Sequence, residues 1–100
     1  MIMRYDFEWD PKKARDNIRK HKVSFERATS IFRDPSLLSI PDEEHSQSEE
    51  RWITIGLDEN GVILVLSHKF VSQDAESTRI RIISARKATK AETKQYEKGI

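Results

Sequence analysis

Arg51 and His68 are the pair of side chains whose spacing most directly suggests chemistry. They lie on two β-rich segments, 51–57 and 62–70, which an Asn-Gly dipeptide at 60–61 joins as a tight turn. A turn of these two residues, or one two residues longer, keeps the same parity, so either register predicts Arg51 and His68 on one face. A guanidinium beside an imidazole could bind a phosphate and move a proton. The alternative is that the pair only borders the core, because the same face also carries aliphatic residues.

A third β-rich segment, residues 79–85, adds further cations. Arg79 and Arg81 alternate with isoleucines and so share a face, and Arg86 follows just beyond the strand end. Positive charge then continues into the last helix through Lys87, Lys90 and Lys94. Arginine suits phosphate binding because its planar fork matches the oxygens in pairs and stays charged at neutral pH. This part of the chain is therefore a candidate anion-binding surface.

Simpler structural explanations exist for the other candidates. Lys20 and His21 belong to a basic cluster at a helix end, where the helix dipole already favours cations. Tyr96 either stacks on a base or anchors the last helix, and anchoring is favoured because that helix has little else to bury. His45 lies among acids in a polar loop and is expected to be solvated. The histidines are too scattered for a metal site and no glycine-rich phosphate loop is present, so no cofactor is expected.

The elements that must position these side chains follow the order strand, two helices, β-meander and C-terminal helix. Alternation and capping signals predict strands at 4–9, 37–40, 51–57, 62–70 and 79–85, helices at 11–22, 25–33 and 90–98, and polar loops at 42–50 and 71–77. Residues 1–100 are therefore expected to form one α+β domain with a small antiparallel sheet. Helices on one side leave part of the other sheet face open, which is a natural place for a ligand.

Composition excludes several classes of protein. The 100 residues contain 18 basic and 17 acidic side chains but no cysteine, which rules out disulfides, thiolate metal sites and a cysteine nucleophile. The longest apolar run, 62–66, is too short to span a membrane, and no signal peptide is evident, so a cytoplasmic domain is expected. Basic segments at 1–22 and 79–98 flank an acidic one at 34–60. This layout suggests an anionic ligand and a separate basic partner, unless the charges serve only solubility.

Short motifs along nearly the whole chain resemble those of one known family. They are Phe7-Glu8-Trp9-Asp10-Pro11, Lys13-Ala14, Asn17, Lys20-His21, Val23-Ser24-Phe25-Glu26, Ala28, Asp34-Pro35, His45-Ser46, Glu49-Glu50-Arg51, Ile55-Gly56, Arg81-Ile82-Ile83-Ser84-Ala85-Arg86, Ala88, Glu92 and Tyr96-Glu97. In order and spacing they resemble the BrnT family, toxins of type II toxin–antitoxin systems. The family usually carries glycine where this chain has Lys22, and glycine there would end the first helix in the left-handed conformation.

The resemblance implies a RelE-like fold and an endoribonuclease that stops translation by cutting RNA. It also implies a cognate antitoxin with a ribbon–helix–helix DNA-binding part, which neutralises the toxin. The joint complex would repress its own operon, so the toxin itself is expected to contact DNA only indirectly.

Metal-independent RNA cleavage needs a base for the 2′-hydroxyl proton, cations for the charge on phosphorus and an acid for the leaving 5′-oxygen. Under the resemblance, His68 is expected to supply the acid–base chemistry, and Arg51 and Arg81 to clamp the phosphate, with Arg86 as a third cation. The residues expected to bind RNA around them are Lys20, His21, Lys69, Lys87, Lys90 and Tyr96. RelE-like enzymes often use lysine, arginine and tyrosine in place of histidine, which keeps the lysine at 69 and the tyrosine at 96 as catalytic alternatives.

A function of another class is the alternative. A non-catalytic basic module that binds RNA or a protein, and acts with a DNA-binding antitoxin in autoregulation, would keep the same arginines. It would need no acid–base partner beside them, and a toxin that has lost its activity would look the same in sequence.

Overall fold

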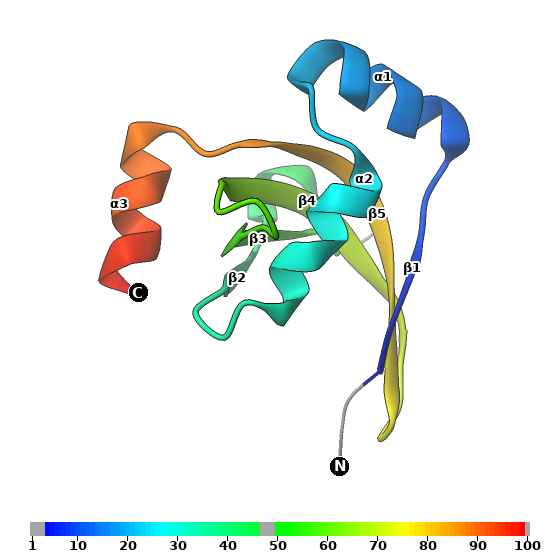
Figure 1. The fold of residues 1–100 in the computed structure, drawn as a ribbon. Helices are drawn as coiled ribbons and strands as arrows, with labels where there is room; N and C mark the ends of the chain where they lie inside the picture. The colour runs from blue at the N-terminus through cyan, green and yellow to red at the C-terminus, as the bar shows by residue number, and fades with distance from the viewer. Residues whose placement is uncertain (1–3, 47–49, 100) are drawn as a thin grey trace.

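Five strands form one mixed sheet in the order β1-β5-β4-β3-β2 in the computed structural model, which describes residues 4–46 and 50–99 (Figure 1). Along the chain the elements are β1 (Arg4–Glu8), α1 (Pro11–His21), α2 (Phe25–Thr29), the 3₁₀ helix η1 (Ser30–Arg33), β2 (Leu38–Pro41), the 3₁₀ helix η2 (Glu43–His45), β3 (Trp52–Leu57), β4 (Ile63–Gln73), β5 (Ser77–Lys87) and α3 (Lys90–Lys98). The predicted α+β class is confirmed, and β2 to β5 form the expected antiparallel meander. The expectation of a wholly antiparallel sheet is wrong, because β1 runs parallel to β5. Alternation identifies a strand and its buried face but neither its partner nor its direction.

Some element boundaries differ from the prediction. The second helix is α-helical for only five residues and then tightens into η1 before Asp34. β4 and β5 are longer than expected, since most of the predicted loop 71–77 pairs as a two-stranded ribbon that turns at 74–76. Residues 71–76 are all exposed and Ser77 is half-buried, so this stretch lacks the alternation of a half-buried strand. Part of the predicted loop 42–50 forms η2, and residues 47–49 lie outside the described residues.

α1 begins and ends at the predicted signals. The Asp10 carboxylate accepts a hydrogen bond from Lys12 N–H at 2.8 Å, and Pro11 takes the first helical position, where the missing N–H does no harm. At the other end Lys22 adopts the left-handed conformation with a φ of 61°, and its N–H donates to Ile18 O at 2.9 Å. The chain thus keeps a left-handed cap without glycine, at a steric cost of about 1–2 kcal/mol.

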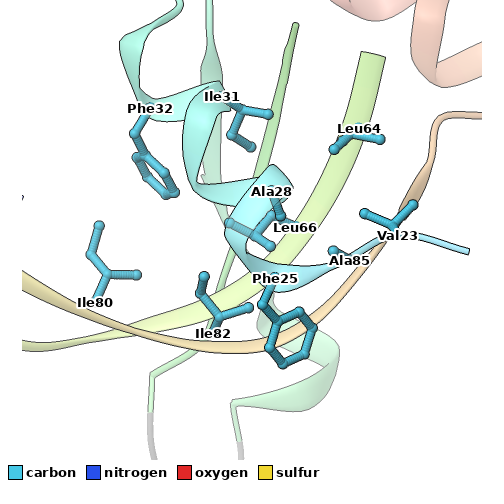
Figure 2. Packing of buried hydrophobic residues seen from close by; sticks show 10 residues of the cluster. All are labelled: Val23, Phe25, Ala28, Ile31, Phe32, Leu64, Leu66, Ile80, Ile82 and Ala85. Atoms are coloured by element: carbon cyan, nitrogen blue, oxygen red, sulfur yellow. The ribbon is translucent and has the colours of Figure 1, made fainter. Parts of the chain in front are cut away.

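α2 and η1 pack across one side of the sheet and enclose the hydrophobic core (Figure 2). The buried cluster consists of Val23, Phe25, Ala28, Ile31, Phe32, Leu64, Leu66, Ile80, Ile82 and Ala85. Gly56 lets η1 come close to the sheet, because a Cβ at this position would lie 2.9 Å from the Ile31 Cβ. We call this side of the sheet the core face, and the side chains of Leu64 and Leu66 of β4 point toward it. We call the opposite side the open face, and the side chain of Val65 of β4 points toward it.

The side chain of Asn17 holds α1 against β5. β1 pairs with β5 only as far as Arg81, so the backbone of β5 beyond that point lacks a strand partner on this edge. The buried Asn17 amide takes the place of one: its Oδ1 accepts from Ala85 N–H at 3.1 Å and its Nδ2 donates to Ala85 O at 2.7 Å. Nδ2 also donates to Val23 O at 2.9 Å. This single side chain therefore fixes the end of α1 and the far part of β5 together.

The β3–β4 hairpin has a three-residue loop instead of the even-numbered loop that Asn-Gly predicts. Asp58 N–H donates to Val62 O at 2.8 Å and closes the loop, while Gly61 supplies a φ of 79°. The buried Asp58 carboxylate accepts the N–H groups of Asn60 and Val62, each at 2.8 Å, and pairs with Arg27. Burial alone would raise the pKa of Asp58, but these hydrogen bonds hold it below its usual value. The longer loop is thus stabilised by a side chain that precedes the turn.

This odd loop changes the register by one residue and separates the two side chains first considered for catalysis. Trp52 pairs with His68, and Ile53 pairs with Ser67. Since successive side chains of a strand point to opposite sides, His68 lies on the core face and Arg51 on the open face. The predicted contact between Arg51 and His68 is therefore wrong.

His68 is a core residue with 0% exposure. Its ring packs edge-on against Phe32 and Phe70, at centroid distances of 5.4 and 5.2 Å. Nε2 is hydrogen-bonded to Thr54 Oγ1 at 2.7 Å, and Thr54 Oγ1 is bonded in turn to Ser39 Oγ, so three polar side chains link β4, β3 and β2. Nδ1 has no hydrogen-bond partner among the described residues. Burial lowers the pKa of His68 to about 4, so the buried ring is neutral at pH 7.

Acidification should therefore destabilise the fold through His68. In the unfolded chain its pKa is about 6.5, so between pH 7 and 5 the unfolded state takes up a proton that the folded state does not, and the free energy of unfolding should fall by about 2 kcal/mol. Urea denaturation at both pH values measures this. A His68→Leu variant carries the same other titratable groups and should lose about 2 kcal/mol less over this interval. An equal loss in both proteins would contradict the assignment.

Candidate active site

A pocket of about 260 Å³ lies on the open face of the sheet, and we call it the open-face pocket. It is lined by Asp42, His45, Arg51, Ile53, Val65, Ser67, Ile83, Ser84 and Arg86. These side chains come from η2 and its cap, from the start of β3, and from the middle of β4 and the second half of β5. Segments far apart in the sequence therefore bring two arginines, a histidine and a carboxylate to one concave surface.

His45 and Asp42 form a pair at the edge of this pocket. The His45 Nδ1 is 2.9 Å from Asp42 Oδ2, and the His45 side chain is 61% exposed. Because Nδ1 is occupied by the carboxylate, Nε2 is the ring nitrogen that can meet a ligand. A carboxylate that is hydrogen-bonded to one ring nitrogen in this way fixes the orientation of the imidazole. The pair therefore leaves His45 Nε2 in a position to accept a proton from a ligand in the pocket.

The backbone around Arg51 fixes this pair relative to the sheet. Asp42 N–H donates to Arg51 O at 2.8 Å, and Arg51 N–H donates to Ser46 Oγ at 2.9 Å. Ser46 Oγ in turn donates to Asp42 O at 2.6 Å. The Arg51 side chain itself is half-buried and forms no ion pair with any described residue. Among the described residues, none therefore competes with an anion in the open-face pocket for its guanidinium donors.

Arg86, in contrast, is held by a carboxylate. Its two terminal nitrogens donate to the Glu92 carboxylate oxygens at 2.7 and 2.8 Å. Glu92 also accepts from Thr89 N–H at 2.9 Å, and Thr89 Oγ1 accepts from Glu92 N–H, which confirms the predicted capping box of α3. The hydrogen bonds from Arg86 lower the pKa of Glu92 to about 2, and those to Glu92 raise the pKa of Arg86. Arg86 is therefore fixed in direction, with its charge largely balanced.

Arg81 lies outside the lining of the open-face pocket. Its guanidinium pairs with the Glu8 carboxylate at 2.9 Å across the β1–β5 contact, and its side chain is 40% exposed. Lys69 is its cross-strand neighbour on β4. The structure therefore does not bring Arg81 together with Arg51 as the predicted phosphate clamp.

The remaining predicted RNA-binding residues also lie outside the pocket lining. Lys20 and His21 are exposed in the last turn of α1, and Lys87 and Lys90 are exposed where β5 leads into α3. Tyr96 anchors α3 by donating its hydroxyl proton to Asp34 Oδ2, which also accepts Leu57 N–H at 2.8 Å. The hydrogen bond to Asp34 raises the pKa of Tyr96 to about 12. Of the two interpretations of this tyrosine, the structure therefore shows the anchor.

Sequence reasoning passed over the pair that the structure brings to the pocket. The sequence predicts a solvated His45 and does not single out Asp42, because a polar loop carries no periodic signal that predicts where its side chains point. A usable signal was the aspartate three residues before the histidine, a spacing that one 3₁₀ turn brings into contact. The His45-Ser46 dipeptide was also among the motifs that carry the family resemblance.

The part of the chain that the structure describes contains no group of three or more histidine, aspartate or glutamate side chains that could hold a metal ion. The open-face pocket offers two potential ligands of this kind, Asp42 and His45, fewer than the three protein ligands of a catalytic zinc site. Across the same described residues, no helix has the length and apolar character to cross a membrane.

Comparisons with known proteins identify the family to which the chain belongs. Residues 9–92 match the family model described as "Ribonuclease toxin, BrnT, of type II toxin-antitoxin system". The crystal structure of the Brucella abortus ribonuclease toxin, BrnT, matches with a TM-score of 0.59 and 22% sequence identity, over 88% of this chain and 100% of that chain, which shows a shared fold. No curated protein matches the sequence. Because the family model spans most of the chain, the chain belongs to the BrnT family of ribonuclease toxins of type II toxin–antitoxin systems.

Proposed function

We propose that this chain is a metal-independent endoribonuclease that cuts RNA in the open-face pocket. The observation that carries the proposal is that Arg51, which no described carboxylate pairs with, lines the same pocket as the Asp42–His45 pair. Such a guanidinium attracts phosphate, and an oriented imidazole can accept a proton. Membership of a family of ribonuclease toxins supports this assignment.

Binding begins with a phosphodiester at Arg51. The guanidinium can donate two parallel hydrogen bonds to phosphate oxygens, and its position beside the start of β3 is fixed by the Asp42 and Ser46 contacts. Arg86 projects into the same pocket in a direction that Glu92 sets. Because two of its nitrogens donate to Glu92, we assign Arg86 a supporting role in orientation and Arg51 the principal phosphate contact.

Cleavage then uses the neighbouring 2′-hydroxyl as the nucleophile. His45 Nε2 removes its proton, the 2′-oxygen attacks phosphorus, and the bond from phosphorus to the 5′-oxygen breaks. The leaving 5′-oxygen takes a proton from solvent, which gives a 2′,3′-cyclic phosphate on one fragment and a 5′-hydroxyl on the other. Arg51 stabilises the negative charge that grows on the non-bridging oxygens, where a fixed cation contributes most.

The biological setting is proposed from the family. A type II toxin–antitoxin system includes an antitoxin, and we propose that here it is a ribbon–helix–helix protein that neutralises this chain in the cytoplasm and carries the DNA contacts of the complex. RNA cleavage by the free toxin would inhibit translation.

Expression of the chain alone in bacteria should therefore arrest growth and protein synthesis, and co-expression of the antitoxin should restore both. Growth and amino-acid incorporation measure the effect. Normal growth at high toxin levels would contradict the proposed translation inhibition.

Substitution of the pocket residues should strongly slow the cleavage of bare RNA, measured in the presence of EDTA. Arg51→Ala should lower the rate by about 10²–10³ because it removes a charge stabiliser. His45→Ala should lower the rate by about 10²–10⁴ because it removes the general base. Gel analysis of a labelled oligonucleotide measures both, and a 2′,3′-cyclic phosphate end identifies the chemistry.

Two exposed side chains outside the pocket provide matched controls. Arg15→Ala removes a cation from α1 and Glu43→Gln changes η2 beside His45, and both variants should cleave at the wild-type rate. Full activity in Arg51→Ala or His45→Ala would contradict the proposed site. Tight RNA binding by the wild-type chain without any product would instead favour the non-catalytic module.

A further inference from the structure

Two consecutive residues of β5, Ile83 and Ser84, both line the open-face pocket. Regular alternation would send one of them to the core face. The register explains the exception: Ser67 pairs with Ser84, but the next residue, His68, pairs with Ile82, so Ile83 is the extra residue of a β-bulge. Bulges beside functional sites commonly re-aim a side chain. Here the bulge adds a further aliphatic side chain to a pocket whose lining also contains two arginines, a histidine and a carboxylate.

Ile83 completes an apolar floor. Ile53 of β3, Val65 of β4 and Ile83 of β5 line the pocket together, and Val65 is 5% exposed. An aliphatic surface of this kind cannot bind a phosphate, because burial of an unpaired charge against it is unfavourable. It suits the flat face of a nucleobase. The volume of about 260 Å³ also exceeds the space that one phosphate group occupies.

Two hydroxyl groups border this floor. Ser67 and Ser84 are cross-strand neighbours, both are half-buried, and neither side chain forms a hydrogen bond with a described residue. A serine hydroxyl both donates and accepts, so an adjacent pair can meet the polar edge of a base. Asn17 holds both backbone groups of Ala85, the residue between Ser84 and Arg86, which keeps these pocket side chains in place.

We infer that the open-face pocket binds one nucleobase next to the scissile phosphate and selects it through Ser67 and Ser84, over the floor that Ile83 completes. This inference rests on the proposed function, because the proposed function places the scissile phosphate of the substrate at Arg51. Single-stranded RNA presents unstacked bases whose edges are open to such contacts. The pocket therefore contributes to the choice of cleavage site.

The test uses RNA oligonucleotides with one cleavable position, in which the flanking base is each of the four bases or is absent. For the wild-type chain, an abasic site on one side of the scissile phosphate should slow cleavage by about 10-fold or more.

Ser67→Ala and Ser84→Ala should each change the relative cleavage rates beside the four bases, and so their ranking. A change of about 10-fold is expected, which is the effect of one lost hydrogen bond. Ile83→Ala should slow cleavage beside every base to a similar extent. Ser72→Ala, on the exposed part of β4 outside the pocket, is the matched control and should leave the ranking unchanged.

Binding of the same oligonucleotides with a 2′-methoxy group at the cleavage site separates recognition from rate. Their affinities should follow the same base ranking and change in the same variants. If the wild-type chain cuts RNA but treats abasic and intact sites alike, or if both serine variants keep the wild-type ranking, the base pocket is wrong while the proposed function stands. If the wild-type chain cuts no RNA, the proposed function fails and this inference fails with it.

Discussion

The three-residue loop that Asp58 closes decides which side chains share a face of this sheet. Its carboxylate accepts two N–H groups of the loop and pairs with Arg27 of α2, so the loop is tied to the core as well as to itself. With this loop, β3 and β4 pair so that His68 is buried among aromatic rings while Arg51 points the other way. A loop one residue shorter or longer would exchange the two faces. The chemistry of the open face therefore depends on a carboxylate that takes no part in it.

The open face also depends on side chains that each hold two parts of the structure. Glu92 caps α3 and fixes the Arg86 guanidinium, and Asn17 of α1 binds both backbone groups of Ala85 at the unpaired edge of β5. Ser46 connects the turn that carries His45 to the start of β3 at Arg51. In a chain of 100 residues with a thin core, such shared contacts let a few side chains hold several elements. The pocket is consequently built on strands and capped helices instead of long free loops.

Local signals were enough to predict much of the fold. The Asp10-Pro11 start of α1 and the Thr89 to Glu92 capping box are read from neighbouring residues, and both are present as expected. The register of the β3–β4 hairpin was not predicted, because both loop lengths that Asn-Gly suggests contain an even number of residues, whereas the Asp58 side chain stabilises a loop of three. The bulge at Ile83 and the parallel pairing of β1 depend on partners distant in sequence, which alternation does not specify.

The candidate site was predicted in part. Arg51 and Arg86 do line one pocket, but the histidine that accompanies them is His45 of η2 instead of the buried His68. A side chain in a polar loop has no periodic pattern, so only the turn geometry shows where it points. Arg81 was selected by its alternation with isoleucine, which gives the correct face, but the Glu8 carboxylate that engages it comes from the parallel strand that was not foreseen.

The central claim is that RNA binds on the open face, at the pocket of Arg51 and His45. It is tested most directly by the backbone amide chemical shifts of the labelled chain on titration with an RNA dinucleotide whose 2′-methoxy group prevents cleavage. The account predicts that the largest shifts fall in residues 42–46, 51–53 and 83–86. Shifts concentrated at the end of α1, around Lys20 and His21, with none at these segments, would contradict it.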